Sequence, residues 1–278
     1  FLWRIIIYMM RTGISIILVF VFCVSVTFAR RIHEINLRAT YDPSSTAGLN
    51  QAPTGTVSGY GTVIFSVENT NQFVYVETTI IVPPKQAHKG TLFLWPGLQP
   101  GGANFYPIDN GVLQPVLTWG PSCAPGTQPA AYSTWWISAQ YVNTYGKLPG
   151  YTDCNGGRIM SVNPGDQLCI KFQLRGTDWT QTVTNRATNM AVTFSINMRG
   201  QAQNNLYFII EQYSSTFVDD VVYLNSSWQF AKPSNNGCNL SSRGMKDFVS
   251  TPRLSADKLS CSVAKIIQRA QENPRPSF

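Results

Sequence analysis

Hydrophobic and polar residues alternate along most of the chain in short runs that end at turn-forming residues. In residues 168–174 every second side chain is Leu, Ile or Phe, and the run follows the turn sequence Asn-Pro-Gly-Asp at 163–166. Comparable runs predict strands at 61–67, 73–82, 91–95, 112–119, 132–140, 178–185, 190–198, 206–213 and 220–225. Many short strands separated by turns predict an all-β protein, built as an antiparallel β-sandwich or barrel.

The N-terminal 29 residues have a different pattern. Arg11 precedes an apolar run at 14–26, and Ala29 supplies a small residue at the expected cleavage edge. This pattern is typical of a secretory signal peptide, with upstream sequence before Met10. We expect cleavage after Ala29; an uncleaved signal anchor is the alternative, although the run is short for a membrane span. The polar residues 30–55 are then a flexible lead-in or a processed segment.

The sandwich domain is expected to cover 56–230, and a basic tail follows at 231–278. In this tail, apolar residues recur at helical spacing after a candidate cap at Ser255. They are Leu259, Val263, Ile266, Ile267 and Ala270. We therefore expect a short C-terminal helix that packs on the sandwich.

Charge is sparse and concentrated near the C-terminus. Charged residues make up 13% of the chain, and the net charge is +7. Loss of Arg4 and Arg11 with the signal peptide lowers it to +5, all carried by the segment from Lys232 onward with its eight basic and three acidic residues. Such a tail can bind an anionic surface, or it can simply be solvated. Basic and aromatic residues are not combined in a way that predicts nucleic-acid binding.

Five cysteines remain after signal cleavage, and export favours disulfides between them. We expect Cys123 to pair with Cys154 and Cys238 with Cys261, although sequence alone does not fix the pairing. Cys169 is then left over. Asn-x-Ser sequences at 225–227 and 239–241 are candidate glycosylation sites and should lie on the surface.

Most catalytic chemistries lack the residues they need. The two histidines, at 33 and 88, form no recognisable Ser or Cys triad, and there is no metal-ligand spacing or phosphate-binding loop. We therefore expect no metal and no cofactor. Glu211 stands out because it lies in the apolar run at 206–213, where a charge is costly unless it is paired. It is either a solvent-facing strand end or a carboxylate with a raised pKa in a site.

An amide offers the best partner for this carboxylate. Strand alternation places Gln114 on one face with Val112 and Val116, and adjacent strands would bring Gln114 and Glu211 together on the same inner face. Aromatic residues near these strands would line a groove, although aromatic residues are more often part of the core. They are Trp95, Trp135, Trp136 and Tyr213.

The motifs around these residues resemble those of the glutamic peptidase (eqolisin) family, in order over about 57–225. They are Thr78–Pro83, Leu94–Gly97, Val112–Gln114, Tyr132–Trp136, Val162–Asp166 and Tyr207–Glu211. The chain differs from the family in having Pro115 and Val116 where a Gly usually follows the Gln. The resemblance implies a concanavalin-like β-sandwich (jelly roll) and a secreted endopeptidase that acts in acid, with Gln114 and Glu211 as its catalytic dyad.

Three functions remain open on the sequence. The first is the peptidase, a monomer with a polypeptide substrate, no nucleic acid and no membrane contact after signal cleavage. The second is a non-catalytic secreted sandwich that binds glycan or protein. The third is an oligomeric structural coat protein.

Overall fold

The computed structural model describes residues 57–87, 90–101, 111–143, 151, 153–213 and 218–269, with only the backbone described at 57–61. All of them belong to one of the two units into which the chain divides, residues 42–278. The expected signal peptide and lead-in segment lie outside the described residues. Within the described part, no helix is long and apolar enough to cross a membrane.

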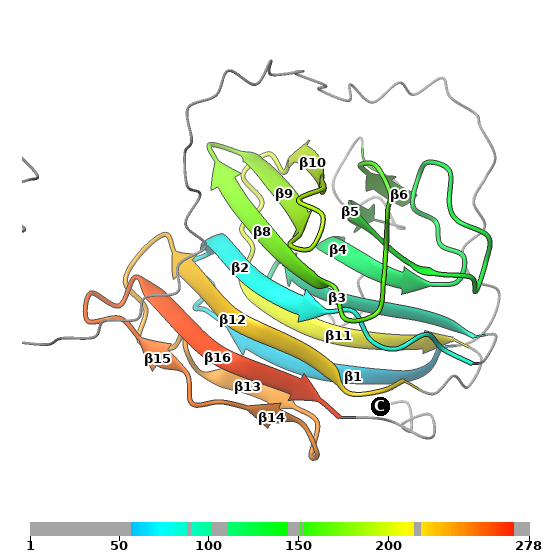
Figure 1. Cartoon of the computed structure of the whole chain (residues 1–278). Helices are drawn as coiled ribbons and strands as arrows, with labels where there is room; N and C mark the ends of the chain where they lie inside the picture. The colour runs from blue at the N-terminus through cyan, green and yellow to red at the C-terminus, as the bar shows by residue number, and fades with distance from the viewer. Residues whose placement is uncertain are drawn as a thin grey trace, which may run out of the picture. The chain divides into compact units, whose positions relative to one another are not determined.

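The described residues form two antiparallel sheets that face each other as a sandwich, which confirms the predicted fold class (Figure 1). Sheet A has the strand order β13-β1-β11-β3-β4-β5-β6, and β7 also pairs with β5. Its strands are β1 (Val57–Ser66), β3 (Thr91–Gln99), β4 (Val112–Trp119), β5 (Trp135–Asn143), β6 (Asp153–Gly156), β7 (Met160–Val162), β11 (Asn205–Tyr213) and β13 (Leu240–Arg243).

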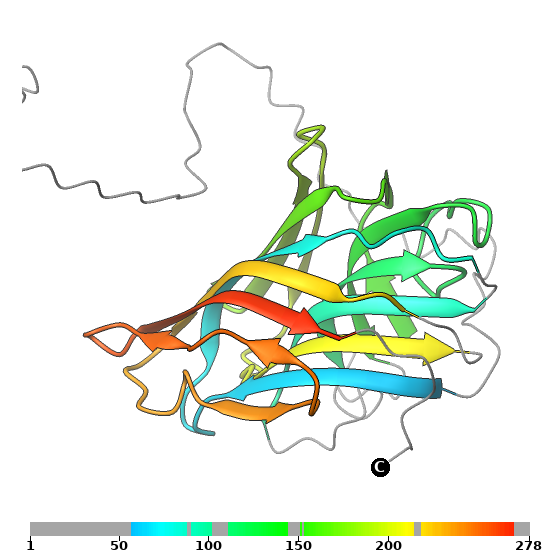
Figure 2. The same cartoon turned by 60° about the horizontal axis from the view of Figure 1, so that its bottom comes forward.

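Sheet B lies over one face of sheet A, as the turned view shows (Figure 2). Its order is β10-β9-β8-β2-β12-β16-β14, with β15 also paired to β16. Its strands are β2 (Phe73–Ile81), β8 (Gln167–Arg175), β9 (Asp178–Asn185), β10 (Ala191–Asn197), β12 (Val221–Phe230), β14 (Phe248–Val249), β15 (Arg253–Leu254) and β16 (Ser260–Gln268).

The main core fills the space between the sheets and follows from strand alternation. In β8, Leu168, Ile170 and Phe172 are fully buried, as the sequence predicts. They belong to one apolar cluster with alternate residues of β3, β4 and β11, such as Leu94 and Phe208. Burial of this apolar area, at about 25 cal/mol for each Å², is the main force that holds the two sheets together.

The opposite face of sheet A carries a second, smaller apolar cluster. Its buried members are Phe93, Trp95, Val112, Val116, Tyr207 and Ile209. Strands β3 and β4 are therefore buried on both faces along their whole length. We call this second face, formed by the odd-numbered residues of β3 and β11 and the even-numbered residues of β4 and β5, the site face.

The predicted C-terminal helix is wrong, because residues 260–268 form strand β16, which lies between β12 and β14 in sheet B. Val263 and Ile266 are both buried, and their spacing of three resembles a helix turn. The spacing arises because the buried side chains of β16 change from odd-numbered to even-numbered positions between Val263 and Ile266. The paired strand β12 makes the same change next to Asn225, whose φ is 51°. Ser255 belongs to the turn before β16, where its hydroxyl donates to Asp257.

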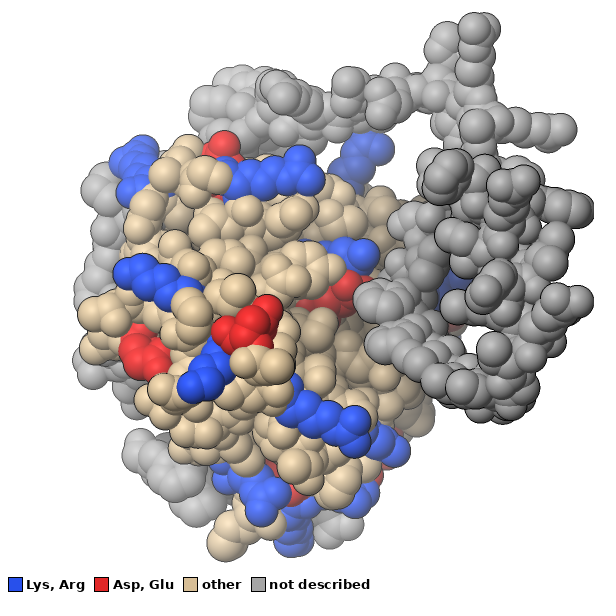
Figure 3. Space-filling model, turned by 90° about the vertical axis from the view of Figure 1, so that its left-hand side faces the viewer, with Lys and Arg blue, Asp and Glu red and all other residues tan. Residues whose placement is uncertain are grey.

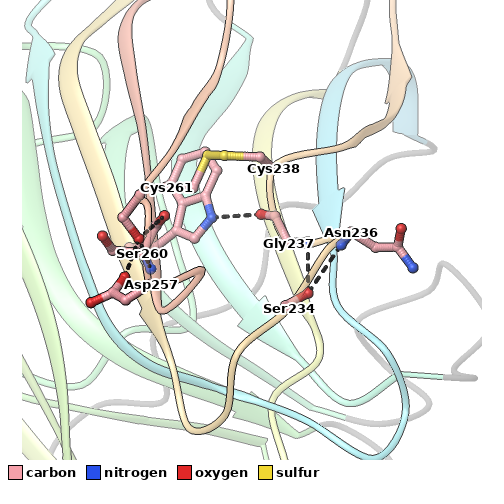
Figure 4. The surroundings of a disulfide bond; sticks show 9 residues. Ser234, Asn236, Gly237, Cys238, Asp257, Ser260 and Cys261 are labelled. Carbon is pink, nitrogen blue, oxygen red and sulfur yellow. Dashed lines mark hydrogen bonds between the residues drawn. A yellow bond between two sulfur atoms is a disulfide. The ribbon is translucent and has the colours of Figure 1, made fainter.

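The C-terminal segment contributes to both sheets. Strand β13 pairs with β1 of sheet A, whereas β14 and β15 pair with β16 of sheet B. A disulfide between Cys238 and Cys261, with Cα atoms 5.5 Å apart, fixes this segment (Figure 4). Beside it, Ser234 Oγ accepts hydrogen bonds from the backbone N–H groups of Asn236 and Gly237.

Both predicted disulfides are present. Cys123 and Cys154 are joined with Cα atoms 5.7 Å apart. Cys169 is in neither disulfide, and its thiol donates to Glu77 Oε1 at 3.3 Å. The two candidate glycosylation residues, Asn225 and Asn239, are exposed as expected.

On one face of the molecule, charged side chains of both signs are interspersed (Figure 3). The face drawn in Figure 3 has Lys and Arg side chains spread across it with Asp and Glu among them. Among the described residues, the ion pairs are Arg269–Asp220 at 2.8 Å and Lys171–Glu77 at 3.8 Å. Both side chains of the Arg269–Asp220 pair are exposed, and exposed pairs of this kind contribute little to stability.

Candidate active site

Glu211 is a buried carboxylate on the site face. It lies on β11 between Tyr60 of β1 and Phe93 of β3, and its side chain is 8% exposed. The indole Nε1–H of Trp95 donates a hydrogen bond to its Oε2 at 2.9 Å. Burial raises the pKa of Glu211 to about 7, although the Trp95 hydrogen bond acts in the opposite direction. The alternative of a solvent-facing strand-end Glu is therefore excluded.

Gln114 lies on the site face of β4, together with Val112 and Val116 as the sequence predicts. Phe93 of β3 pairs with Glu211 of β11 on one side and with Thr118 of β4 on the other, so these residues share the site face across three strands. The Gln114 side chain is 6% exposed, and its buried Oε1 has no hydrogen-bond partner among the described residues. A buried acceptor left without a donor costs roughly 1–3 kcal/mol, so this position is unfavourable for folding alone.

The expectation that Gln114 and Glu211 lie on adjacent strands is wrong, because β3 runs between β4 and β11. The two residues lie at opposite ends of a diagonal that crosses β3 at Trp95. Each diagonal step between neighbouring strands spans roughly 7–8 Å, so the two backbones are on the order of 15 Å apart. Within the described part of the chain no hydrogen bond joins the two side chains, and they flank the Trp95 indole from either side.

Gly97 allows the Trp95 indole to lie flat along β3. A Cβ atom at position 97 would come within 2.8 Å of Trp95 Cζ3 and 3.0 Å of Val112 Cγ1. Because Leu98 pairs with Leu113, position 97 falls opposite Gln114. The six-membered ring of Trp95 thus lies beside Gln114, while its N–H reaches Glu211.

Two prolines interrupt the ladder between β3 and β4 at this point. The expected end of the strand before Pro96 is wrong, because β3 continues to Gln99 and Pro96 pairs with Phe208 of β11. Toward β4 the pairing stops after Leu94 and resumes at Leu98, so Pro96 falls opposite Pro115. Neither proline has an N–H, so both ladder hydrogen bonds are missing here. Proline is rare in central strands, and local violations of folding rules gather at functional sites.

The tryptophans of β5 point in opposite directions. Trp135 does not line the site face: it is fully buried in the main core toward sheet B, and its Nε1 donates to the Pro84 carbonyl at 3.1 Å. Trp136 is on the site face opposite Thr118, and its Nε1 donates to the Gly120 carbonyl at 3.2 Å. Consecutive strand residues face opposite sides, so only one of them can line a groove.

Tyr213 and Phe93 complete the apolar side of the site. Tyr213 is half-buried on the site face, with its ring 5.6 Å from that of Phe93 in an edge-on arrangement. Sequence reasoning missed Phe93, although its position two residues before Trp95 in a strand places both on one face. It also missed Ser138 and Gln140, the site-face residues of β5 opposite Val116 and Gln114.

The arrangement suits acid–base chemistry by a carboxylate and an amide. No group of three or more His, Cys, Asp or Glu that could hold a metal occurs in the described ranges. A carboxylate with a pKa near 7 can accept and return a proton near neutral pH. The N–H of an amide side chain such as Gln114 can donate a hydrogen bond to an oxygen that develops negative charge.

Comparisons with known proteins give similarities at the level of structure. No family model and no curated protein matches the chain. A structure of scytalido-glutamic peptidase with a peptide-based transition-state analogue is 16% identical over 75% of this chain and 99% of that chain, with a TM-score of 0.48. SCP-B, a member of the eqolisin family of peptidases solved with a tripeptide, is 16% identical over the same shares, with a TM-score of 0.45. A family 16 endo-glucanase from Bacteroides ovatus is 11% identical over 59% of this chain and 69% of that chain, with a TM-score of 0.31. At such identities and TM-scores these similarities carry no conclusion about activity.

Proposed function

We propose that this protein is an endopeptidase in which Glu211 activates water and Gln114 binds the carbonyl oxygen of the scissile peptide bond. The observation that carries the proposal is the buried Glu211 carboxylate with a pKa raised to about 7, held by Trp95 on the same face as Gln114. A buried carboxylate with a raised pKa adds no stability to the folded protein, whereas a pKa near 7 suits a general base that works near neutral pH.

The reaction needs one proton to move twice. Ionised Glu211 takes a proton from a water molecule as the water oxygen bonds to the carbonyl carbon. The Gln114 Nε2–H group donates to the resulting oxyanion. Protonated Glu211 then gives the proton to the amide nitrogen as the carbon–nitrogen bond breaks, which releases an amine and a carboxylic acid. The separation of Gln114 and Glu211 leaves the reacting groups room between them, above Trp95.

Burial of Glu211 shifts the expected working pH. The resemblance to acid-acting peptidases led us to expect activity in acid. With a pKa near 7, Glu211 is mostly protonated below pH 6 and cannot act as a base there. In this proposal kcat/KM therefore rises with pH through about 7.

Secretion is part of the proposal. The two disulfides suit an oxidising compartment, and the apolar run before Ala29 suits export. The substrate is then a polypeptide met outside the cell, with no nucleic acid or membrane required.

The test is cleavage of a denatured protein across pH 4–9, followed by mass spectrometry of the products. Wild type is compared with Glu211→Gln, Gln114→Ala and the control Gln173→Ala, an exposed glutamine of β8 on the other sheet. We expect cleavage by wild type and the control, and a loss of at least about 100-fold in both site variants. Equal activity in all four proteins would refute the dyad.

A non-catalytic binding module is the second candidate, because one observation favours it. The amide and carboxylate lie on different strands with β3 between them, and no hydrogen bond links them among the residues described. A binding face tolerates that spacing without any chemistry. Absence of cleavage by wild type, together with retained binding of an unfolded polypeptide, would select this candidate.

A further inference from the structure

A row of small and amide side chains crosses the site face beside Gln114. Gln114 of β4 pairs directly with Gln140 of β5, and Gln140 pairs with Gly156 of β6. Gly97 of β3 occupies the position on the other side of Gln114. The two glutamines thus stand next to each other, with Cβ atoms about 5 Å apart, and a glycine flanks each of them.

Three polar side-chain atoms, two in this row and one on the adjacent Ser138, are buried without a hydrogen-bond partner within the described ranges. Gln140 is 1% exposed and Ser138, two residues earlier on the same face, is 0% exposed. Gln114 Oε1, Gln140 Oε1 and Ser138 Oγ have no hydrogen-bond partner in the part of the chain that the structure describes. At roughly 1–3 kcal/mol for each buried unsatisfied group, the three together lower the stability of the unliganded protein substantially.

Packing does not require polar residues at these positions. Their neighbours on the site face of β4 are Val112 and Val116, which are buried and apolar. The glycines bring bulky groups close to the row: Trp95 lies over Gly97, and a Cβ at Gly156 would be 3.3 Å from Pro125 Cδ. The disulfide at Cys123 holds the loop that carries Pro125. The amides therefore stand between an aromatic ring and a covalently fixed loop.

We propose that Gln140, together with Gln114 and Ser138, is a subsite that binds N–H groups of an extended polypeptide substrate. This inference rests on the proposed peptidase function and adds a specificity-determining residue to it. The carbonyl ends of the two amides accept N–H donors from the substrate main chain or from an amide side chain, while Gln114 Nε2 donates to the scissile carbonyl. The apolar side of the site, at Phe93 and Tyr213, binds the segment on the other side of the cleaved bond.

The proposal predicts that Gln140→Met stabilises the protein and at the same time weakens substrate binding. Methionine matches the length of glutamine but has no strong acceptor, so the variant no longer buries an unsatisfied carbonyl. It should unfold at a higher temperature than wild type while it binds substrate about tenfold more weakly, as expected for one lost hydrogen bond. A residue with a purely structural role would change stability without changing substrate affinity.

The probe is the oxidised B chain of insulin, a flexible polypeptide. Its binding is measured by calorimetry in the Glu211→Gln background, where no cleavage occurs, for Gln140→Met, Ser138→Ala and the control Gln173→Met. Weaker binding by Gln140→Met and Ser138→Ala, with the control unchanged, supports the subsite whether or not wild type cleaves the peptide. Unchanged binding in both variants, or no binding by the parent protein, overturns it. Cleavage by wild type reports separately on the proposed function.

Discussion

Replacing Glu211 with Gln should stabilise the protein at alkaline pH. The pKa is 4.5 for an ordinary Glu side chain and about 7 for buried Glu211. The folded state therefore binds more protons than the unfolded state between these values, and the free energy of unfolding falls as pH rises through this window. At 1.36 kcal/mol for each pKa unit, the full loss is about 3 kcal/mol above pH 7. Gln at this position keeps an acceptor for Trp95 but never ionises, so it avoids the loss.

Urea unfolding at pH 4 and pH 8 measures the effect. We expect wild type and Glu211→Gln to have similar free energies of unfolding at pH 4, and the variant to be more stable by about 3 kcal/mol at pH 8. Glu68→Gln is the matched control, because hydrogen bonds from the backbone and Ser234 lower the pKa of Glu68. This shift is opposite in direction to the shift of the Glu211 pKa. A variant that is no more stable than wild type at pH 8 would show that Glu211 is not a buried, ionisable group.

Three further predictions concern the surroundings of the site. Trp95→Phe removes the hydrogen bond that lowers the carboxylate pKa, so the lower limb of the pH–rate profile should move to higher pH; an unmoved limb contradicts this role. Pro115→Ala supplies an N–H opposite Pro96 and should raise the free energy of unfolding by about 0.5–1.5 kcal/mol, measured in urea; a loss of stability would mean that the ladder gap is needed for packing. Serine at both Cys238 and Cys261 should lower stability by about 2–4 kcal/mol in the same assay; an unchanged midpoint contradicts a structural disulfide.

Strand positions could be predicted because alternation is a local signal. Residues 168–174 form most of strand β8, and the expected face is buried because every second side chain is apolar and points toward sheet A. The same local reading failed at Val263 and Ile266, because a change of parity shared by two strands imitates helical spacing. The cause lies in β12, which is distant in sequence, so the tail alone could not reveal it.

The site was predictable only in part for the same reason. Alternation placed Glu211 and Gln114 on buried strands and gave Gln114 its apolar neighbours. The order of strands is a long-range property, and nothing near either residue indicates that β3 lies between them. The mutual position of Pro96 and Pro115 also depends on the pairing of β3 with β4. Strand alternation alone could have separated Trp135 from the site face, because it is adjacent to Trp136.

The central claim is that Glu211 is the general base, and it is tested most directly by comparing two pH titrations. One is the Glu211 carboxyl itself, followed by infrared difference spectroscopy of wild type against Glu211→Gln. The other is kcat/KM for a peptide substrate, which reports the pKa of the free enzyme's base. We predict that both have a midpoint near pH 7. Cleavage that stays at full rate at pH 4, while the carboxyl is protonated, would contradict the account.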